Sequence, residues 1–225
     1  MSNGCNHLNH ANAYASFQER VFVLKFTRKS ILGLLVAAFL CLFATPVISG
    51  TVLFSDNFNA ENGGVGVLNY TGFANWSVTA GTVDLIGNGY FDFYPGQGLY
   101  VDLDGSTNSA GLFSSILNLD PGVYELQFAL GGSARGQTEV VTVNLAGIYN
   151  ETFTMLSNDP LTNFTRTIIV NAPVTGTLNF YDNSQDNVGA ILDDIKLTMV
   201  PEPASMLLLG FGLIGLAGFA TRRKK

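Results

Sequence analysis

Apolar and polar residues alternate in short runs through most of the chain. Between residues 51 and 200, runs rich in Val, Thr, Phe, Tyr and Ile are separated by clusters of Gly, Asn, Asp and Pro. Such runs with turn residues between them are typical of β-strands. The run 123–128 (VYELQF) alternates with a period of two, as a strand buried on one face does. This stretch contains no apolar 3.6-residue pattern of helical length.

The pattern predicts eleven strands, at residues 52–54, 76–79, 82–86, 98–103, 111–117, 123–130, 138–145, 151–155, 163–170, 177–181 and 189–199. Many short strands with turn signals between them predict an all-β fold, a β-sandwich of jelly-roll type. We therefore expect one β-sandwich domain at residues 50–200, flanked by two other segments.

The first flanking segment contains the apolar run 31–44, which follows Lys25, Arg28 and Lys29 and precedes TPVISG. A basic region, an apolar core and small residues suited to cleavage form the secretory signal pattern. Fourteen residues would span only about 21 Å as a helix, less than the ~30 Å hydrocarbon core of a membrane. Residues 1–49 are therefore predicted to be an N-terminal extension and signal peptide, not a membrane anchor.

The second flanking segment contains the apolar run 204–220, which is followed by Arg222, Arg223, Lys224 and Lys225. Seventeen apolar residues are just long enough to span a membrane, and the basic cluster would stay in the cytoplasm. We predict a transmembrane helix at 204–220. An ordinary tail anchor is the alternative to a processed sorting signal.

The residues before this helix, Pro201-Glu202-Pro203, favour the sorting signal. Together with the apolar run and the basic tail, they resemble the PEP-CTERM sorting signal of Gram-negative bacteria. The resemblance covers residues 201–225. It implies processing by the membrane transpeptidase exosortase. It also implies passage through the inner membrane to the cell surface or an extracellular polysaccharide matrix.

Composition changes the picture of the domain between these segments. Residues 51–200 carry fifteen acidic and three basic residues, a net charge of −12, whereas the net charge of the whole chain is only −6. Nucleic-acid binding is excluded, because neutralising phosphates requires Lys and Arg. Both cysteines and both histidines lie in the first 41 residues, at Cys5, Cys41, His7 and His10. The domain therefore has no disulfide, thiolate or imidazole chemistry.

Several motifs of the domain occur in an order seen in a known fold. They are NWSV at 75–78, GTVD at 81–84, GLYVDLDG at 98–105, DPGVYELQF at 120–128 and AILDDIKL at 190–197. This order resembles the galactose-binding-like jelly roll of carbohydrate-binding modules and of choice-of-anchor secreted proteins. The resemblance implies the fold, and it leaves the function open because the fold serves many purposes.

The last strand offers a candidate metal ligand. Period-two alternation places Asp193 on one face with the apolar residues Ile191, Ile195 and Leu197. A carboxylate that faces the core must be hydrogen-bonded, paired or metal-bound. The resemblance implies a structural calcium ion between the first and last strands, with Asp193 as a ligand.

Further ligands would come from the segment 55–61, as Asp56, Asn59 and Glu61. The family usually has an acidic residue at the position of Asn59. The alternative is that backbone amides and Asn side chains satisfy Asp193.

The segment 87–98 is rich in aromatic residues and offers a candidate binding surface. Tyr90 and Tyr94 could stack on sugar rings, while Asp92 and Gln97 bond sugar hydroxyls. We expect the other two aromatic side chains, Phe91 and Phe93, to point into the core. The alternative is that the segment only packs the sandwich.

Other polar residues can be interpreted as binding residues or as purely structural ones. Asp102 and Asp104 could be further ligands, and turn caps are favoured. The loop 182–187 resembles a calcium loop but lacks the glycine and glutamate of an EF-hand, so a polar hairpin loop is favoured. Arg135 lies in a Gly-rich loop, where it could grip a ligand or be a solvated charge.

No catalytic constellation stands out, since fifteen carboxylates guarantee accidental pairs. The sequence predicts an exported, non-enzymatic protein of the extracellular polysaccharide or biofilm layer that binds carbohydrate. A structural or adhesive matrix protein without a specific saccharide site is the second hypothesis. A polysaccharide hydrolase or lyase is the third.

Overall fold

The computed structural model describes residues 50–201 and residue 212. They form strands β1 (Thr51–Asp56), β2 (Ser77–Thr79), β3 (Asp84–Gly87), β4 (Leu99–Asp102), β5 (Leu112–Leu119), β6 (Gly122–Gly131), β7 (Thr138–Leu145), β8 (Tyr149–Leu156), β9 (Thr162–Val170), β10 (Val174–Asp182), β11 (Ile191–Val200) and a short 3-10 turn, η1 (Glu61–Gly64). All eleven predicted strands are present, with ends that differ by at most three residues.

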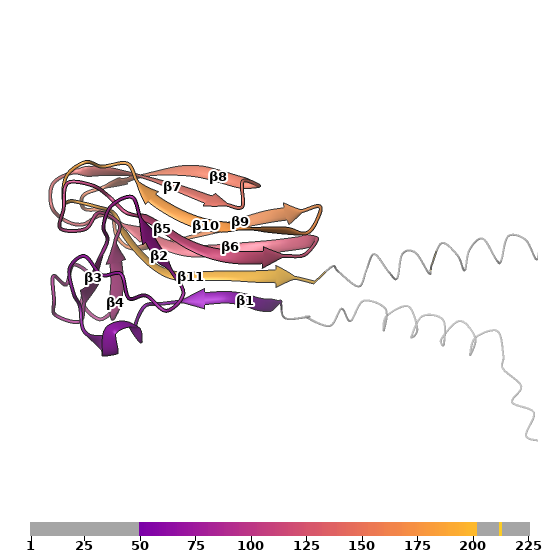
Figure 1. Ribbon diagram of the computed structural model, residues 1–225, viewed down its shortest axis with the longest axis horizontal. Coiled ribbons are helices and arrows are strands. Elements are labelled where there is room, and N and C mark those ends of the chain that lie inside the picture. The colour runs from indigo at the N-terminus through magenta and orange to yellow at the C-terminus, as the bar shows by residue number, and fades with distance from the viewer. Residues whose placement is uncertain (1–49, 202–211, 213–225) are drawn as a thin grey trace, which may run out of the picture. The chain divides into compact units, whose positions relative to one another are not determined.

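The strands form two antiparallel sheets that face each other (Figure 1). Sheet A has the order β3-β4-β11-β6-β9, with β1 also paired to β11, and sheet B has the order β2-β5-β10-β7-β8. This arrangement confirms the predicted all-β sandwich. The predicted signal peptide and the predicted helix at 204–220 lie outside the described residues, except for residue 212. Within the described part of the chain, no helix is long and apolar enough to cross a membrane.

Strand β11 is the centre of sheet A because it is hydrogen-bonded on both edges. One edge pairs with β6 along nearly its whole length. The other edge pairs first with β4, through Ile191 and Leu192, and then with β1, from Ile195 onward. The pairing of β11 with β6 contains a β-bulge between Asp193 and Lys196, at the residues where the other edge changes partner. Within this bulge, Asp194 has a φ of 49°, in the left-handed region. Asp tolerates this conformation better than most residues.

The bulge changes the predicted phase of β11. Leu192, Ile195 and Leu197 join the main core, whereas Ile191 joins a second cluster. The prediction that Ile191 shares a face with Ile195 and Leu197 is therefore wrong, because the extra residue of a bulge shifts the period-two pattern. The predicted burial of Asp193 is confirmed, since its side chain is 1% exposed.

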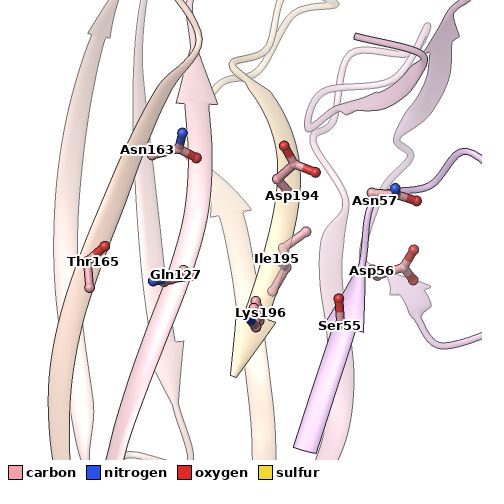
Figure 2. Close-up of a pocket in the computed structure, with 9 residues that line it drawn as sticks. All are labelled: Ser55, Asp56, Asn57, Gln127, Asn163, Thr165, Asp194, Ile195 and Lys196. Carbon is pink, nitrogen blue, oxygen red and sulfur yellow. The ribbon is translucent and has the colours of Figure 1, made fainter. Parts of the chain in front are cut away.

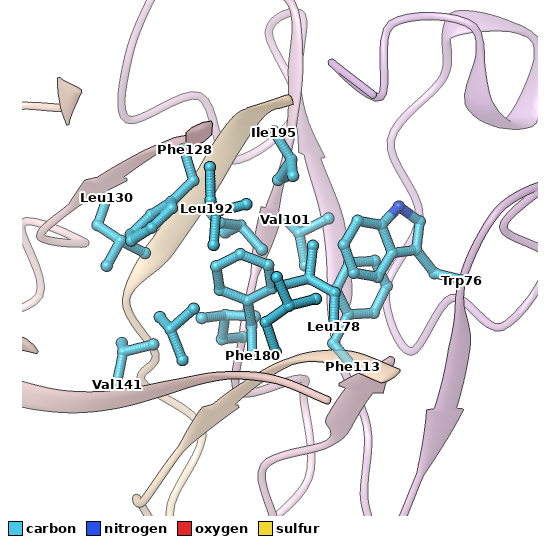
Figure 3. Close-up of a cluster of buried hydrophobic side chains, with 14 of the residues drawn as sticks. Trp76, Val101, Phe113, Phe128, Leu130, Val141, Leu178, Phe180, Leu192 and Ile195 are labelled. Carbon is cyan, nitrogen blue, oxygen red and sulfur yellow. The ribbon is translucent and has the colours of Figure 1, made fainter. Parts of the chain in front are cut away.

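The main core fills the space between the sheets with aromatic and aliphatic side chains. Figure 3 shows Phe113 and Phe180 near Leu192 and Ile195, with Trp76 at the side. The rings of Trp76 and Phe113 stack with centroids 4.4 Å apart at an interplanar angle of 11°. The indole N–H of Trp76 donates a hydrogen bond to Asp56 of β1, so the polar group of this buried ring has a partner. Buried Trp usually needs such a partner.

The second cluster involves residues of sheet A and the β3–β4 loop. It consists of Ile86, Tyr100 and Ile191, packed against Phe93 and Tyr94 of the β3–β4 loop, and against Leu68 and Leu161. The segment 88–98 therefore folds back against its own strands instead of extending away from them.

Strand register shows which residues lie together at each end of the sandwich. At one end, which we call the loop end, Ile191 lies beside Asp102 and Gly131. At the other, which we call the exit end, Met199 lies beside Thr51. The ten residues of β11 separate the two ends by about 30 Å at ~3.4 Å per residue. The described chain thus begins and leaves its last strand at the exit end.

Replacing Phe113 by Ala tests the core. The ring is fully buried against Trp76, so we expect a loss of about 3–5 kcal/mol in the free energy of unfolding. Urea denaturation measures it. Ile116→Ala is the matched control, because Ile116 lies on the same strand but is 75% exposed, and its loss should be within about 0.5 kcal/mol. Equal losses in the two variants would contradict this core.

Candidate functional site

A pocket of about 200 Å³ lies at the loop end, and we call it the end pocket. One wall is apolar and the other is polar. The apolar residues are Leu68, Ile86, Phe91 and Phe93, and the polar residues are Asp84, Asp102, Ser106, Arg135 and Asn187. The polar wall contains two carboxylates and one guanidinium, so the pocket combines an aromatic surface with charged hydrogen-bonding groups.

The two carboxylates of the end pocket face each other across neighbouring strands. Asp84 of β3 and Asp102 of β4 are register partners. Asp84 accepts hydrogen bonds from the backbone N–H of Asn69 and from both the N–H and the hydroxyl of Ser106. Asp102 accepts one from the N–H of Asp104. That last bond confirms the turn-cap interpretation of Asp102.

Arg135 of the β6–β7 loop holds the other oxygen of Asp102, with 3.4 Å between Nη1 and Oδ2. Burial raises the pKa of Asp102 well above its usual range, opposed by the N–H of Asp104 and by the charge of Arg135. Arg135 is therefore a partner of a buried carboxylate and not simply a solvated loop charge. One of the five N–H donors of its guanidinium group makes this contact.

The aromatic wall includes a residue in a strained conformation. Phe91 has a φ of 46°, which is rare for a bulky side chain, and its ring is 55% exposed. Tyr90 packs edge-on against it, with ring centroids 4.9 Å apart. Strain of this kind clusters at binding and active sites.

The prediction for the aromatic segment is wrong in part. Phe91 was expected in the core and Tyr94 on the surface, and they are placed the other way round. The Tyr94 hydroxyl donates to the backbone carbonyls of Gly132 and Asp159, so its ring is tied to the sandwich. Phe93 packs inward, as expected.

The remaining predicted residues of this segment divide into two kinds. Asp92 accepts hydrogen bonds from the hydroxyl of Tyr100 and from the backbone N–H of Gly89, so it shapes the loop. Tyr90 is 38% exposed and Gln97 is exposed. Sugar binding by Tyr90, Asp92, Tyr94 and Gln97 stays a prediction.

A second, larger pocket of about 450 Å³ lies on sheet A, and we call it the strand-face groove (Figure 2). Figure 2 shows side chains from β1, β6, β9 and β11 around it. Its lining residues are Ser55, Asp56, Asn57, Gln127, Asn163, Thr165, Asp194, Ile195 and Lys196. None of these residues is aromatic, so the groove offers hydrogen bonds without a stacking surface.

The predicted calcium ligands accept hydrogen bonds from other groups of the same chain. Asp193 accepts the N–H of Asp194 at 2.7 Å, and Asn59 accepts the N–H of Leu99 at 2.7 Å. Both oxygens of Glu61 accept the N–H of Ala74.

Asp56 also holds a set of donors, at the end of β1. One oxygen accepts the N–H of Phe58, and the other accepts the Trp76 indole N–H and the Asn75 amide. The alternative interpretation concerns Asp193, and the bond from the backbone N–H of Asp194 is of the kind that it expects. Calcium binding by Asp193, Asp56, Asn59 and Glu61 stays a prediction.

Sequence reasoning missed three features of the end pocket. Asp84 was noted only as the last residue of the motif at 81–84, with no binding role. The exposure of Phe91 depends on a loop conformation that residue types do not specify. The pairing of Arg135 with Asp102 joins residues 33 positions apart.

Strand β11 runs directly into the end of the chain that carries the sorting signature. Residues 200–224 match the PEP-CTERM protein-sorting motif. This match confirms the resemblance seen at Pro201-Glu202-Pro203 and indicates export and sorting to the cell surface through exosortase.

Solved structures with a similar arrangement include carbohydrate-binding β-sandwich domains. The CBM22-1 xylan-binding domain of Xyn10C from Paenibacillus barcinonensis is 16% identical, with a TM-score of 0.43, over 70% of this chain and 99% of that one. The K3 adhesin domain of Lys-gingipain from Porphyromonas gingivalis is 18% identical, with a TM-score of 0.43, over 66% of this chain and 99% of that one.

A multimodular chain matches over a smaller share of its length. The CBM22-1–GH10 modules of Clostridium thermocellum xylanase 10B are 16% identical, with a TM-score of 0.40, over 68% of this chain. This chain covers 29% of that one. No curated protein matches this chain in sequence.

Replacing Asp193 by Asn tests the electrostatics of the buried carboxyl. Burial, aided by the charges of Asp194 and Asp56 and opposed by the Asp194 N–H, raises the pKa of Asp193 to about 7. A raised pKa gives stability that is complete below about pH 4 and is lost as the pH rises through 7. Asn stays neutral, so the variant should gain up to about 4 kcal/mol over the native protein at pH 8 and nothing at pH 4.

Urea denaturation at both pH values, in EDTA, measures this gain. Asp194→Asn is the comparison variant, because it removes only one of the charges that raise the pKa of Asp193 and should therefore gain less than Asp193→Asn at pH 8. A difference between Asp193→Asn and the native protein that is the same at pH 4 and pH 8 would contradict the prediction.

Proposed function

We propose that this protein is a non-catalytic, surface-sorted protein that binds a carbohydrate of the extracellular polysaccharide layer in the end pocket. The observation that carries the proposal is the exposed ring of Phe91, on a backbone with positive φ, beside the charged groups of the same pocket. Sugar rings have apolar faces and polar edges, and sites that hold them pair aromatic surface with a few directed polar groups. The strand-face groove lacks that aromatic surface among its lining residues.

The polar wall supports binding more than hydrolysis. All four oxygens of Asp84 and Asp102 already accept hydrogen bonds or an ion pair from the chain. A glycosidase needs one carboxyl group that gives a proton to the leaving group and a second, free carboxylate that activates a water molecule or attacks the sugar. Arg135 and Asn187 are better placed to bond a ligand, since Arg135 retains donors and Asn187 is exposed in the pocket wall.

The position of the pocket suits a surface-sorted protein. The sorting motif begins at the exit end, directly after β11. The end pocket lies at the loop end, about 30 Å away along that strand. A domain processed at its exit end would present this pocket away from the membrane.

Replacing Phe91 tests the proposal. Against a glycan array and against polysaccharide extracted from the producing cells, Phe91→Ala and Phe91→Leu should each weaken binding at least about fivefold, since stacking on a ring contributes ~1 kcal/mol or more. Phe91→Tyr should retain binding. Ile169→Ala is the control, because Ile169 is an exposed apolar residue on β9.

Three outcomes would overturn the proposal. A native protein that binds no saccharide would be a structural or adhesive matrix component. Binding that Phe91→Leu leaves intact would place the ligand elsewhere or make the contact merely apolar. Release of reducing sugar that Asp84→Asn or Asp102→Asn abolishes would make the protein a hydrolase or lyase.

A further inference from the structure

A group of four carboxylates, which we call the acidic cluster, lies at the loop end. Asp104 follows β4, Glu139 lies in β7, Asp182 ends β10, and Asp186 lies in the β10–β11 loop. The first three are at most 4% exposed, and Asp186 is partly buried. Residues up to 82 positions apart in sequence thus bring carboxyl groups into one region that is almost shielded from solvent.

Strand pairing and one hydrogen bond bring the members of the acidic cluster together. Asp182 is the register partner of Val141, two residues after Glu139, and the hydroxyl of Ser184, in the same loop as Asp186, donates to Asp104. Burial is the first cause that raises the pKa of Glu139 to about 7 and of Asp104 and Asp182 to about 6, and the charges of the other members add to it. Every one of the six pairs contributes in this way. The four side chains therefore form one electrostatic unit, in which ionisation of one opposes ionisation of the rest.

Three oxygens of the acidic cluster are buried without a hydrogen-bond partner. They are Asp104 Oδ1, Glu139 Oε1 and Asp182 Oδ1. In Asp104 and Asp182 the second oxygen is held, by the Ser184 hydroxyl at 2.6 Å and by the Ala190 N–H at 2.8 Å. An unpaired buried carboxylate oxygen is costly, so the fold orients these groups without completing their bonding.

The cationic side chains of residues 50–201 do not complete it. Arg135 lowers the pKa of Glu139 but is bonded to Asp102. Arg166 pairs with Glu151 at 2.6 Å, and Lys196 lines the strand-face groove. The acidic cluster therefore keeps an excess of negative charge that the described chain does not neutralise.

We infer that the acidic cluster is a binding site for one divalent cation, calcium. Its ligands would be the three unpartnered oxygens, with Asp186 as a fourth carboxylate. Calcium takes six to eight oxygen ligands in flexible geometry, whereas magnesium requires near-ideal octahedral geometry and keeps its waters. Among residues 50–201 no three acidic side chains already converge as in a formed site, so the ion would draw them together against their mutual repulsion.

This site is separate from the predicted calcium site at Asp193 and does not depend on saccharide binding. It would tie the β4–β5 and β10–β11 loops to β7 and β10 at the loop end.

Thermal unfolding of the chelated protein with added CaCl₂ tests the inference. At calcium about a hundredfold above its Kd, the melting temperature should rise by roughly 5–10 °C. The variants Asp104→Asn and Asp182→Asn should each lose most of this rise. In EDTA they should melt above the native protein, because each removes a repelling charge. This second readout shows that the variants fold and that the native charges oppose one another.

Asp193→Asn is the matched control, because it is also a buried carboxyl but lies outside the acidic cluster, and it should keep the calcium response. MgCl₂ at the same concentration should give a smaller rise. A native protein that does not respond to calcium would overturn the inference. A response that Asp193→Asn abolishes and Asp182→Asn retains would overturn it as well, by placing the ion at the other site.

Discussion

The structure depends on the way β11 is paired. A single strand is bonded to β6 on one edge and shares its other edge between β4 and β1. The pairing with β6 shifts register between Asp193 and Lys196, at the residues where the other edge changes partner from β4 to β1. The bulge buries one carboxyl and turns the next toward the strand-face groove. The same pairing brings Thr51 beside Met199, so both chain connections leave from the exit end.

Local pattern was sufficient for the strands but not for the faces of all their residues. Alternation and turn residues located every strand, because both depend on near neighbours. The phase of β11 depends instead on two partner strands that arrive from far away in the sequence. Tyr94 shows the same limit, since its hydroxyl bonds residues 38 and 65 positions away. Its ring could not be assigned to a face from the composition of its own segment.

The candidate sites are assembled by topology from residues with weak individual signals. The turn-cap interpretation of Asp102 was locally correct, because its oxygen accepts the N–H two residues on. Sequence spacing did not indicate that Asp102 would also lie beside Asp84 and Arg135. The acidic loop 182–187 was interpreted alone as a polar hairpin loop, but its Ser184 hydroxyl donates to Asp104, and the charges of Asp182 and Asp186 help to raise the pKa of Glu139. The net charge of −12 indicated an excess of acid without indicating that part of it is buried.

The charge of Arg135 acts on both the end pocket and the acidic cluster. Its guanidinium contacts Asp102 on the pocket side and favours ionisation of Glu139 on the cluster side. A cation held by the acidic cluster would repel Arg135 and weaken its attraction to that side, while the ion pair with Asp102 would remain. The donors of Arg135 that are not bonded to Asp102 would then face less competition from buried carboxylates and be more available to a ligand in the end pocket. Through this one side chain, the buried charge that costs the fold stability would also set how strongly the pocket can bond a sugar.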